Sequence, residues 1–327
     1  MKKYKMASLF AGIGGIDLGF ENAGIKTVWA NEIDTFSAST YSANHPDVKL
    51  VIDDIKNVDG KDIPKVDILA GGFPCQAFSV AGHRKGFKDE RGNLFFEIIR
   101  LIEEMANNNN KPKIIFLENV KNLYNHDSGR TYKIIVKMLK DVLGYTVLTK
   151  ILNSCEYGNI PQNRERIYIV AFLDKEVANR FVWPLPIPLN NTIETVVDWN
   201  MTVDKKYYYT ENMKCHSLVK EGVTDSYKIY QYRRVYVREN KSNLCPTLTA
   251  NMGTGGHNVP LIIDNKKRIR KLTPRECLNL QGFPNEFIIP ENLTDTKIYK
   301  QAGNSVSVPV IQRIAEEIVE AITNEDN

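Results

Sequence analysis

Short apolar runs alternate with helical patterns through the first half of the chain. Each run has the length of a buried strand, and the clearest helical pattern between two runs covers residues 94–105. Parallel strands need a helical crossover to return the chain, so this alternation favours a doubly wound, mostly parallel α/β sheet. The expected strands are residues 4–10, 27–31, 50–52, 66–70, 114–117, 146–152 and 167–172.

The character of the chain changes near residue 183. The sequence WPLPIP at residues 183–188 excludes a regular helix and predicts a linker. Aromatic and basic clusters follow, together with a turn-rich stretch at 251–258, and they indicate a smaller, β-rich and irregular second domain. Helical patterns resume after residue 273 and end in a helix over 308–322.

Charge is distributed unevenly. The net charge of the chain is +4. Residues 205–275 carry 15 Lys or Arg against 5 Asp or Glu, a local excess of +10. A basic segment attached to a mildly acidic body suggests a module that binds a polyanion, although a solvated charged face is the alternative.

The cysteines and the N-terminal residues indicate in which cellular compartment the protein works. The five cysteines are scattered, and no pair has the spacing of a zinc site or a disulfide framework. No stretch has the pattern of a signal peptide or a membrane span. We therefore expect a cytoplasmic protein without a structural metal.

Polar residues follow the first three expected strands. The glycines of residues 12–15 resemble a dinucleotide fingerprint, but Asp17 stands at its third glycine position. Glu32 ends the second strand, where an acid suits ribose hydroxyls. Asp54 follows the third strand and is placed to reach an adenine amino group. A nucleoside cofactor that has no pyrophosphate would explain why the third glycine is missing. S-adenosylmethionine is such a cofactor.

A single cysteine stands at the end of the fourth strand. The sequence GGFPCQ at residues 71–76 places Cys75 after a tight turn, at the sheet edge where such proteins bind ligands. A thiolate with a lowered pKa is a strong nucleophile, whereas an isolated cysteine is more often a small buried hydrophobe.

Charged residues also follow the later strands. Glu118 ends the fifth strand, where an apolar setting predicts a raised pKa and a shared proton with a ring nitrogen. Arg164 and Arg166 alternate before the last strand, so one faces the site while the other braces neighbouring groups. A structural salt bridge is the alternative for either arginine.

These motifs together resemble the DNA (cytosine-5) methyltransferase family, in order and over nearly the whole chain. The resemblance implies a Rossmann-like, S-adenosylmethionine-dependent fold. The matching segments are residues 10–15, Glu32, Asp54, 72–76, 91–95, 118–120, 162–166, 270–277, 281–284 and 303–306.

The resemblance also implies a mechanism. The Cys75 thiolate adds to carbon 6 of a cytosine that has swung out of the duplex. Glu118 shares a proton with N3 and Arg166 polarises the exocyclic oxygen, so carbon 5 becomes nucleophilic and takes the methyl group. Loss of the carbon-5 proton then expels Cys75.

The resemblance assigns each site residue a role. The catalytic residues are Cys75, Glu118, Asn119, Arg164 and Arg166. The cofactor-binding residues are Phe10, Ala11, Gly12, Gly14, Gly15, Glu32, Ile33, Asp54, Ile55, Pro74, Leu94, Asn304, Ser305 and Val306. With the basic and aromatic content of 186–271, the DNA contacts are Gln76, Ser79, Ala81, Arg91, Arg233, Arg234, Arg238, Thr247 and Leu248.

The resemblance further implies a division of the chain and a biological context. Residues 1–185 and 272–327 form the catalytic domain, and 186–271 form the target-recognition domain. The chain is expected to act as a monomer on double-stranded DNA, as the modification enzyme beside a restriction endonuclease that it does not bind stably.

Several other functions are weighed against this one. A nicotinamide-dependent oxidoreductase leaves Cys75 and Glu118 unexplained. An amino-group DNA methyltransferase needs an Asp/Asn-Pro-Pro-Tyr/Phe segment, which the sequence lacks. A catalytically dead DNA-binding regulator is disfavoured because every catalytic position is filled. The closest rival is a transfer-RNA (cytosine-5) methyltransferase, although its Cys-Phe-Thr tripeptide is missing.

Overall fold

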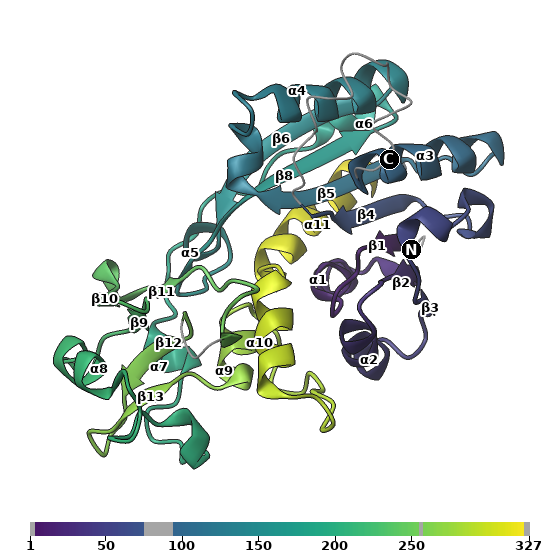
Figure 1. The fold of residues 1–327 in the computed structure, drawn as a ribbon. Helices are drawn as coiled ribbons and strands as arrows, with labels where there is room; N and C mark the ends of the chain where they lie inside the picture. Colours follow the sequence, from purple (N-terminus) through teal and green to yellow (C-terminus); the bar gives the residue numbers. More distant parts are fainter. Residues whose placement is uncertain (1–3, 75–93, 255–257, 324–327) are drawn as a thin grey trace. The chain divides into compact units, whose positions relative to one another are not determined.

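The structure is a computed structural model that describes residues 4–74, 94–254 and 258–323. The chain divides into two compact units (Figure 1). The first unit comprises Met1–Leu152, Glu165–Leu185 and Val310–Asn327, and the second comprises Asn153–Arg164 and Pro186–Pro309. Residues 183–188 form neither helix nor strand, as their prolines predict.

The first unit is built on a seven-stranded sheet with the order β3-β2-β1-β4-β5-β8-β6. The pairs from β3 to β5 are parallel, whereas β5 and β8 run antiparallel. This confirms the expected mostly parallel sheet, and every expected strand is present. The strands are β1 (Lys5–Leu9), β2 (Lys26–Asn31), β3 (Lys49–Val51), β4 (Ile68–Gly72), β5 (Ile114–Val120), β6 (Thr146–Asn153) and β8 (Glu165–Phe172).

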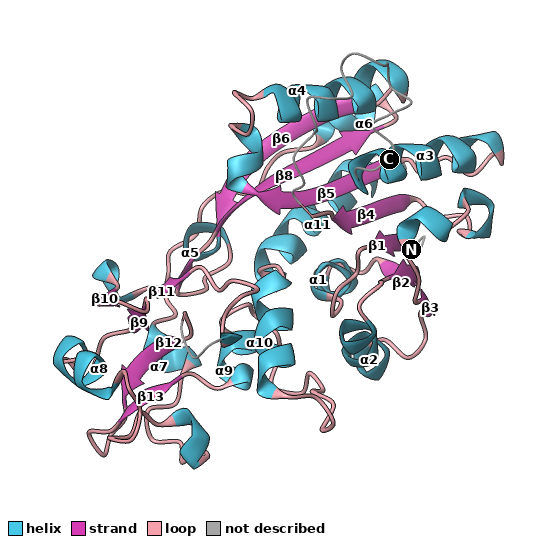
Figure 2. Ribbon diagram, viewed as in Figure 1, coloured by secondary structure: helices cyan, strands magenta, loops and turns pink. Residues whose placement is uncertain are grey.

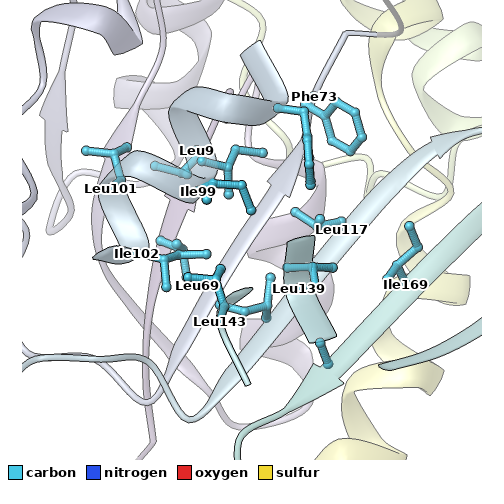
Figure 3. Packing of buried hydrophobic residues seen from close by; sticks show 14 of the residues in the cluster. Leu9, Leu69, Phe73, Ile99, Leu101, Ile102, Leu117, Leu139, Leu143 and Ile169 are labelled. Atoms are coloured by element: carbon cyan, nitrogen blue, oxygen red, sulfur yellow. The ribbon is translucent and has the colours of Figure 1, made fainter. Parts of the chain in front are cut away.

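Helices cover both faces of this sheet (Figure 2). On one face, the helix α3 presents Ile98, Ile102 and neighbouring apolar residues to Leu69 and Leu117, in the core shown in Figure 3. On the other face, the Phe20 ring of α1 meets Phe116 edge to face, at 5.0 Å between centroids. The helices of this unit are α1 (Gly15–Asn22), α2 (Thr35–Asn44), α3 (Leu94–Asn107), α4 (Arg130–Lys137), α6 (Lys175–Arg180) and, in largest part, α11 (Val308–Thr323).

The second unit holds a small antiparallel sheet with the order β10-β9-β12-β13. Tyr230 and Leu261 pack against Val219 in its core, which lies under the helix α8. A short parallel pair joins β7 (Gln162–Asn163) to β11 (Cys245–Pro246). The remaining elements are β9 (Tyr230–Tyr232), β10 (Val237–Glu239), β12 (Pro260–Ile263), β13 (Ile269–Lys271), α5 (Ser154–Tyr157), α7 (Ile193–Val196), α8 (His216–Gly222), α9 (Pro274–Asn279) and α10 (Asp295–Asn304).

Residues 272–309 pack within the second unit, whereas the predicted division assigned them to the catalytic domain. Two interactions account for this packing. The buried Arg270 guanidinium pairs with Glu276 at 2.7 Å, and the Tyr299 hydroxyl donates to the Leu272 carbonyl at 2.5 Å. Residues 272–309 therefore belong to the same compact unit as the small sheet. The functional assignment of the two domains stays a prediction.

None of the described helices is long and apolar enough to span a membrane.

Candidate active site

The glycine turn after β1 is fixed by a carboxylate from the end of β2. The Glu32 Oε2 atom accepts the Gly12 amide at 2.7 Å, and Oε1 accepts the Asp34 amide at 2.8 Å. Gly12 has a positive φ of 59°, and a Cβ atom built on it would meet nothing within 4 Å. The turn therefore borders open space at Gly12, where a ligand can approach the backbone closely.

The other predicted cofactor residues of the first unit lie in different environments. Ile33 is 61% exposed. Asp54 is half-buried and accepts the Lys56 amide at 3.0 Å, so its carboxylate caps a short helical turn. Ile55, the first residue of that turn, is buried in the core. The remaining predicted residues here are Phe10, Ala11, Gly14, Gly15, Pro74 and Leu94.

A buried polar cluster lies behind the glycine turn, and sequence reasoning missed it. Asp17 is fully buried and accepts hydrogen bonds from the Ser8 and Tyr41 hydroxyls, both at 2.9 Å. Burial raises the pKa of Asp17 despite these hydrogen bonds and the neighbouring His45. Asp17 stands where the fingerprint has its third glycine, and that departure was the available signal.

Glu118 and Arg166 form an ion pair at the ends of β5 and β8. The Arg166 Nε atom lies 3.1 Å from Glu118 Oε1, and both side chains are nearly buried, at 13% and 11% exposure. Strand register brings them together. Val120 of β5 is the register partner of Arg166, and Glu118 lies two residues before Val120 on the same face of the sheet. On the other side, Gly72 of β4 is the register partner of Glu118. A Cβ atom on Gly72 would lie 3.4 Å from Glu118 Oε2.

Asn119 ties the end of β4 to β5. Its Nδ2 atom donates to the Phe73 carbonyl at 2.7 Å, and its Oδ1 atom accepts the Val120 amide at 2.8 Å. The backbone that leads to Pro74 is thus held beside Glu118. Cys75, Gln76, Ser79, Ala81 and Arg91 lie outside the described residues.

Arg164 has a different environment from Arg166. It is buried in the second unit, where its guanidinium donates to the Leu248 carbonyl at 2.8 Å and to the carbonyls of Gly303 and Ser305. Thr247 joins the same assembly, since its hydroxyl donates to the Asn163 carbonyl at 2.6 Å. Arg164 therefore holds two loops of the second unit together through their backbones.

The last predicted cofactor segment follows α10. Asn304 is exposed, whereas Ser305 and Val306 are buried. Gly303 lies so close to the backbone of Thr249 that a Cβ atom built on Gly303 would lie 2.2 Å from the Thr249 carbonyl. This segment and the loop at Thr247–Thr249 thus meet without room for a side chain.

The predicted DNA-binding arginines lie on or beside one hairpin of the second unit. β9 and β10 pair antiparallel, and Arg233 and Arg234 occupy the turn between them. Arg238 lies on β10, and all three arginines are exposed. The Arg233 guanidinium donates to Gln231 at 3.0 Å, and the Tyr232 hydroxyl donates to the Arg234 carbonyl at 3.0 Å.

Solved structures define the class of this fold. A DNMT2 mutant from Spodoptera frugiperda matches with a TM-score of 0.73 and 21% identity over 97% of this chain and 100% of that one. The Entamoeba histolytica methyltransferase EhMeth matches with a TM-score of 0.75 and 20% identity over 98% and 99%. The fold is that of S-adenosylmethionine-dependent methyltransferases.

Sequence comparison narrows the class to a family. The family model described as C-5 cytosine-specific DNA methylase matches residues 4–320. The type II methyltransferase M.Bsp6I of Bacillus sp. (strain RFL6) is 56% identical over 97% of this chain and 99% of its own length. M1.ScrFI of Lactococcus lactis subsp. cremoris is 44% identical over 98% and 79%. The chain belongs to the C-5 cytosine-specific DNA methylase family, and it is a DNA (cytosine-5) methyltransferase.

Proposed function

We propose that this enzyme is the modification methyltransferase of a type II restriction–modification system in the cytoplasm, where an endonuclease cuts the same site. It methylates carbon 5 of one cytosine in a short duplex site. The names of its relatives support the type II assignment. The observation that carries the chemistry is the Glu118–Arg166 pair beside Gly72, because Cys75 follows that strand end by three residues.

Each group of the proposed site has a defined task. The Cys75 thiolate forms a bond to carbon 6 of the flipped-out cytosine, which makes carbon 5 nucleophilic. Glu118 shares a proton with N3 and offsets the charge that develops on the ring. Arg166 orients Glu118 through its Nε atom at 3.1 Å and polarises the exocyclic oxygen. Carbon 5 then takes the methyl group from the sulfonium, whose sulfur is left as a neutral thioether. Release of the carbon-5 proton to water re-forms the 5,6 double bond and expels the thiolate.

The glycine turn fits S-adenosylmethionine. Gly12 borders open space, and Glu32 has acceptor capacity left for ribose hydroxyls after it accepts two backbone amides. Ile33 offers an exposed apolar surface to the adenine ring. The sulfonium of the cofactor supplies an electrophilic methyl group.

The second unit supplies DNA recognition in this proposal. Its hairpin turn carries exposed arginines, and Arg164 fixes the loop that holds Thr247 and Leu248. Phosphate contacts from the arginines set the register on the duplex, and contacts to base edges select the site. We propose that a monomer is sufficient, because one chain carries all of these parts.

Transfer of a labelled methyl group from S-adenosylmethionine to plasmid DNA tests the proposal, and bisulfite sequencing of the product locates the modified cytosine. We expect one short methylated sequence from the parent enzyme and none from Cys75→Ser, which should still bind DNA and cofactor. The matched control is Cys155→Ser, which changes a half-buried thiol of the second unit and should keep the activity.

Two results would contradict the proposal. A Cys75→Ser enzyme that turns over at the parental rate would exclude the covalent step. Label transferred to transfer RNA but not to the plasmid would favour the rival transfer-RNA function, which the sequence left open.

A further inference from the structure

An open pocket of about 400 Å³ lies in the second unit, between the turn that precedes α8 and the β9–β10 hairpin. Four cationic side chains line it: Lys206, Lys214, Arg234 and Lys271. Tyrosine rings form much of the remaining wall. Of the described residues that line the pocket, none carries a carboxylate. The pocket is therefore basic as well as aromatic.

Two of these cations crowd one tyrosine. The Lys206 Nζ atom lies 5.0 Å from the centroid of the Tyr207 ring, and the Lys271 Nζ atom lies 5.7 Å from the same centroid. Asp295 pairs with Lys206 at 2.8 Å. The Asp295 carboxylate also acts on Lys271 through its charge, and the Lys271 ammonium group lies near the rings of Tyr207 and Tyr299.

The charge of Lys271 is incompletely compensated. Burial lowers its pKa, the nearby Lys206 lowers it further, and Asp295 acts in the opposite direction without restoring it. An anion bound in the pocket would compensate the positive charge of Lys271, because it would attract the ammonium groups of Lys206 and Lys271 at once.

Arg234 is placed at the pocket by a strained turn. Its φ is 68°, a left-handed conformation that a residue with a side chain rarely adopts. The Tyr232 hydroxyl secures the turn by donating to the Arg234 carbonyl at 3.0 Å. Strain of this kind persists where the surroundings fix it, and here Arg234 is one of the residues that line the pocket.

We propose that this pocket binds a backbone phosphate of the DNA through Lys206, Lys214, Arg234 and Lys271. The inference rests on the proposed function and adds residues to it. A phosphodiester carries one negative charge and several acceptor oxygens, which suit ammonium and guanidinium donors. Because these donors meet a phosphate and not a base edge, the contact adds affinity and fixes register without reading sequence.

The test measures binding of a target duplex and a scrambled duplex by fluorescence anisotropy over a series of salt concentrations. Lys271→Gln and Lys214→Gln should each weaken both duplexes to a similar extent, by roughly tenfold at ~0.1 M salt. Each should also reduce the slope of log K against log salt by about 1. Lys214 is exposed, so its variant keeps the test valid even if Lys271→Gln unfolds.

The matched control is Lys266→Gln, which removes the same charge from an exposed residue of the second unit outside the pocket. It should keep the parental slope. An equal loss in this control would show that only net charge matters, and parental slopes in both pocket variants would show that no phosphate binds there. A changed methylation site would assign a base contact instead. If the parent itself neither binds nor methylates DNA, the proposed function fails first, and the pocket assignment falls with it.

Discussion

The His45 imidazole occupies the space that a side chain on Gly14 would need. A Cβ atom built on Gly14 would lie 2.2 Å from His45 Nε2, closer than any real contact of this kind. Gly14 also has a φ of 86° at the start of α1. The turn that borders the predicted cofactor site is therefore packed from behind by a histidine from the end of α2.

This relationship predicts the effect of Gly14→Ala. The methyl group must displace the buried His45 ring, so the turn shifts, and we expect both weaker binding of S-adenosylmethionine and a lower melting temperature. Calorimetry and thermal unfolding measure the two effects. The left-handed backbone alone costs an added side chain about 1–2 kcal/mol.

Gly24→Ala separates backbone strain from displacement of the ring. Gly24 has the same φ of 86°, and a Cβ atom on it would meet nothing within 4 Å. Gly24→Ala should show the same backbone strain as Gly14→Ala but bind S-adenosylmethionine with the parental affinity. Equal cofactor affinities in the two variants would mean that His45 yields without disturbing the turn.

His45 also makes the stability of the first unit depend on pH. Burial lowers its pKa, but the hydrogen bond to Glu21, with Nδ1 and Oε2 3.4 Å apart, and the charges of Asp17 and Glu21 raise it above the usual value overall. Tyr41 of α2 also faces the ring, with centroids 4.6 Å apart. A raised folded-state pKa adds stability below about pH 6.5, and this stability is lost as pH rises through the folded-state pKa.

We therefore expect Glu21→Gln to lower the free energy of unfolding most at mildly acidic pH. The difference from the parent enzyme should shrink as the pH rises through the pKa of His45 in the folded state. Denaturant unfolding at a series of pH values measures it. A difference that stays constant with pH would mean that Glu21 supports the fold without favouring the protonated ring.

Glu118→Gln should reduce single-turnover methyl transfer by roughly 10²-fold or more, the usual scale for a positioned proton donor. The amide keeps the shape but loses the charge that pairs with Arg166. Glu165→Gln is the matched control, because Glu165 pairs with Lys121 at the surface. Parental turnover in the Glu118 variant would make the ion pair merely structural.

The sequence predicted the sheet well because its strands are apolar runs whose ends carry the glycines and the acids. Glu32 and Glu118 lie near strand ends for the same reason: Glu32 directly follows β2, Glu118 lies two residues before the end of β5, and parallel strands bring these ends to one edge. Once the strands are placed, the register between neighbouring strands determines which of these residues face each other.

The polar cluster of Asp17 and His45 could not be predicted in this way. Both are polar residues in or next to helices, and only tertiary packing buries them. The role of Arg164 was equally hidden, since its partners at Leu248 and Ser305 stand far along the chain. Hydrophobic pattern says little about which distant carbonyls a guanidinium will meet.

The buried pair of Arg270 and Glu276 gives the last prediction. The two side chains are 0% and 4% exposed, and the guanidinium donates to both carboxylate oxygens, at 2.7 and 2.8 Å. Glu276 Oε2 also accepts the Thr273 amide at the start of α9. Because Glu276→Gln leaves a buried cation without its counter-charge, it should destabilise the second unit by about 3–5 kcal/mol.

Thermal and denaturant unfolding measure this loss, and Glu239→Gln is the matched control. Glu239 pairs with Lys228 at 2.8 Å, but both side chains are exposed, so water replaces the lost partner and stability should change little. Similar losses in the two variants would show that the Arg270 cation finds other compensation. A large loss confined to Glu276→Gln would show that the pair joins β13 to α9, which keeps residues 272–309 packed with the small sheet.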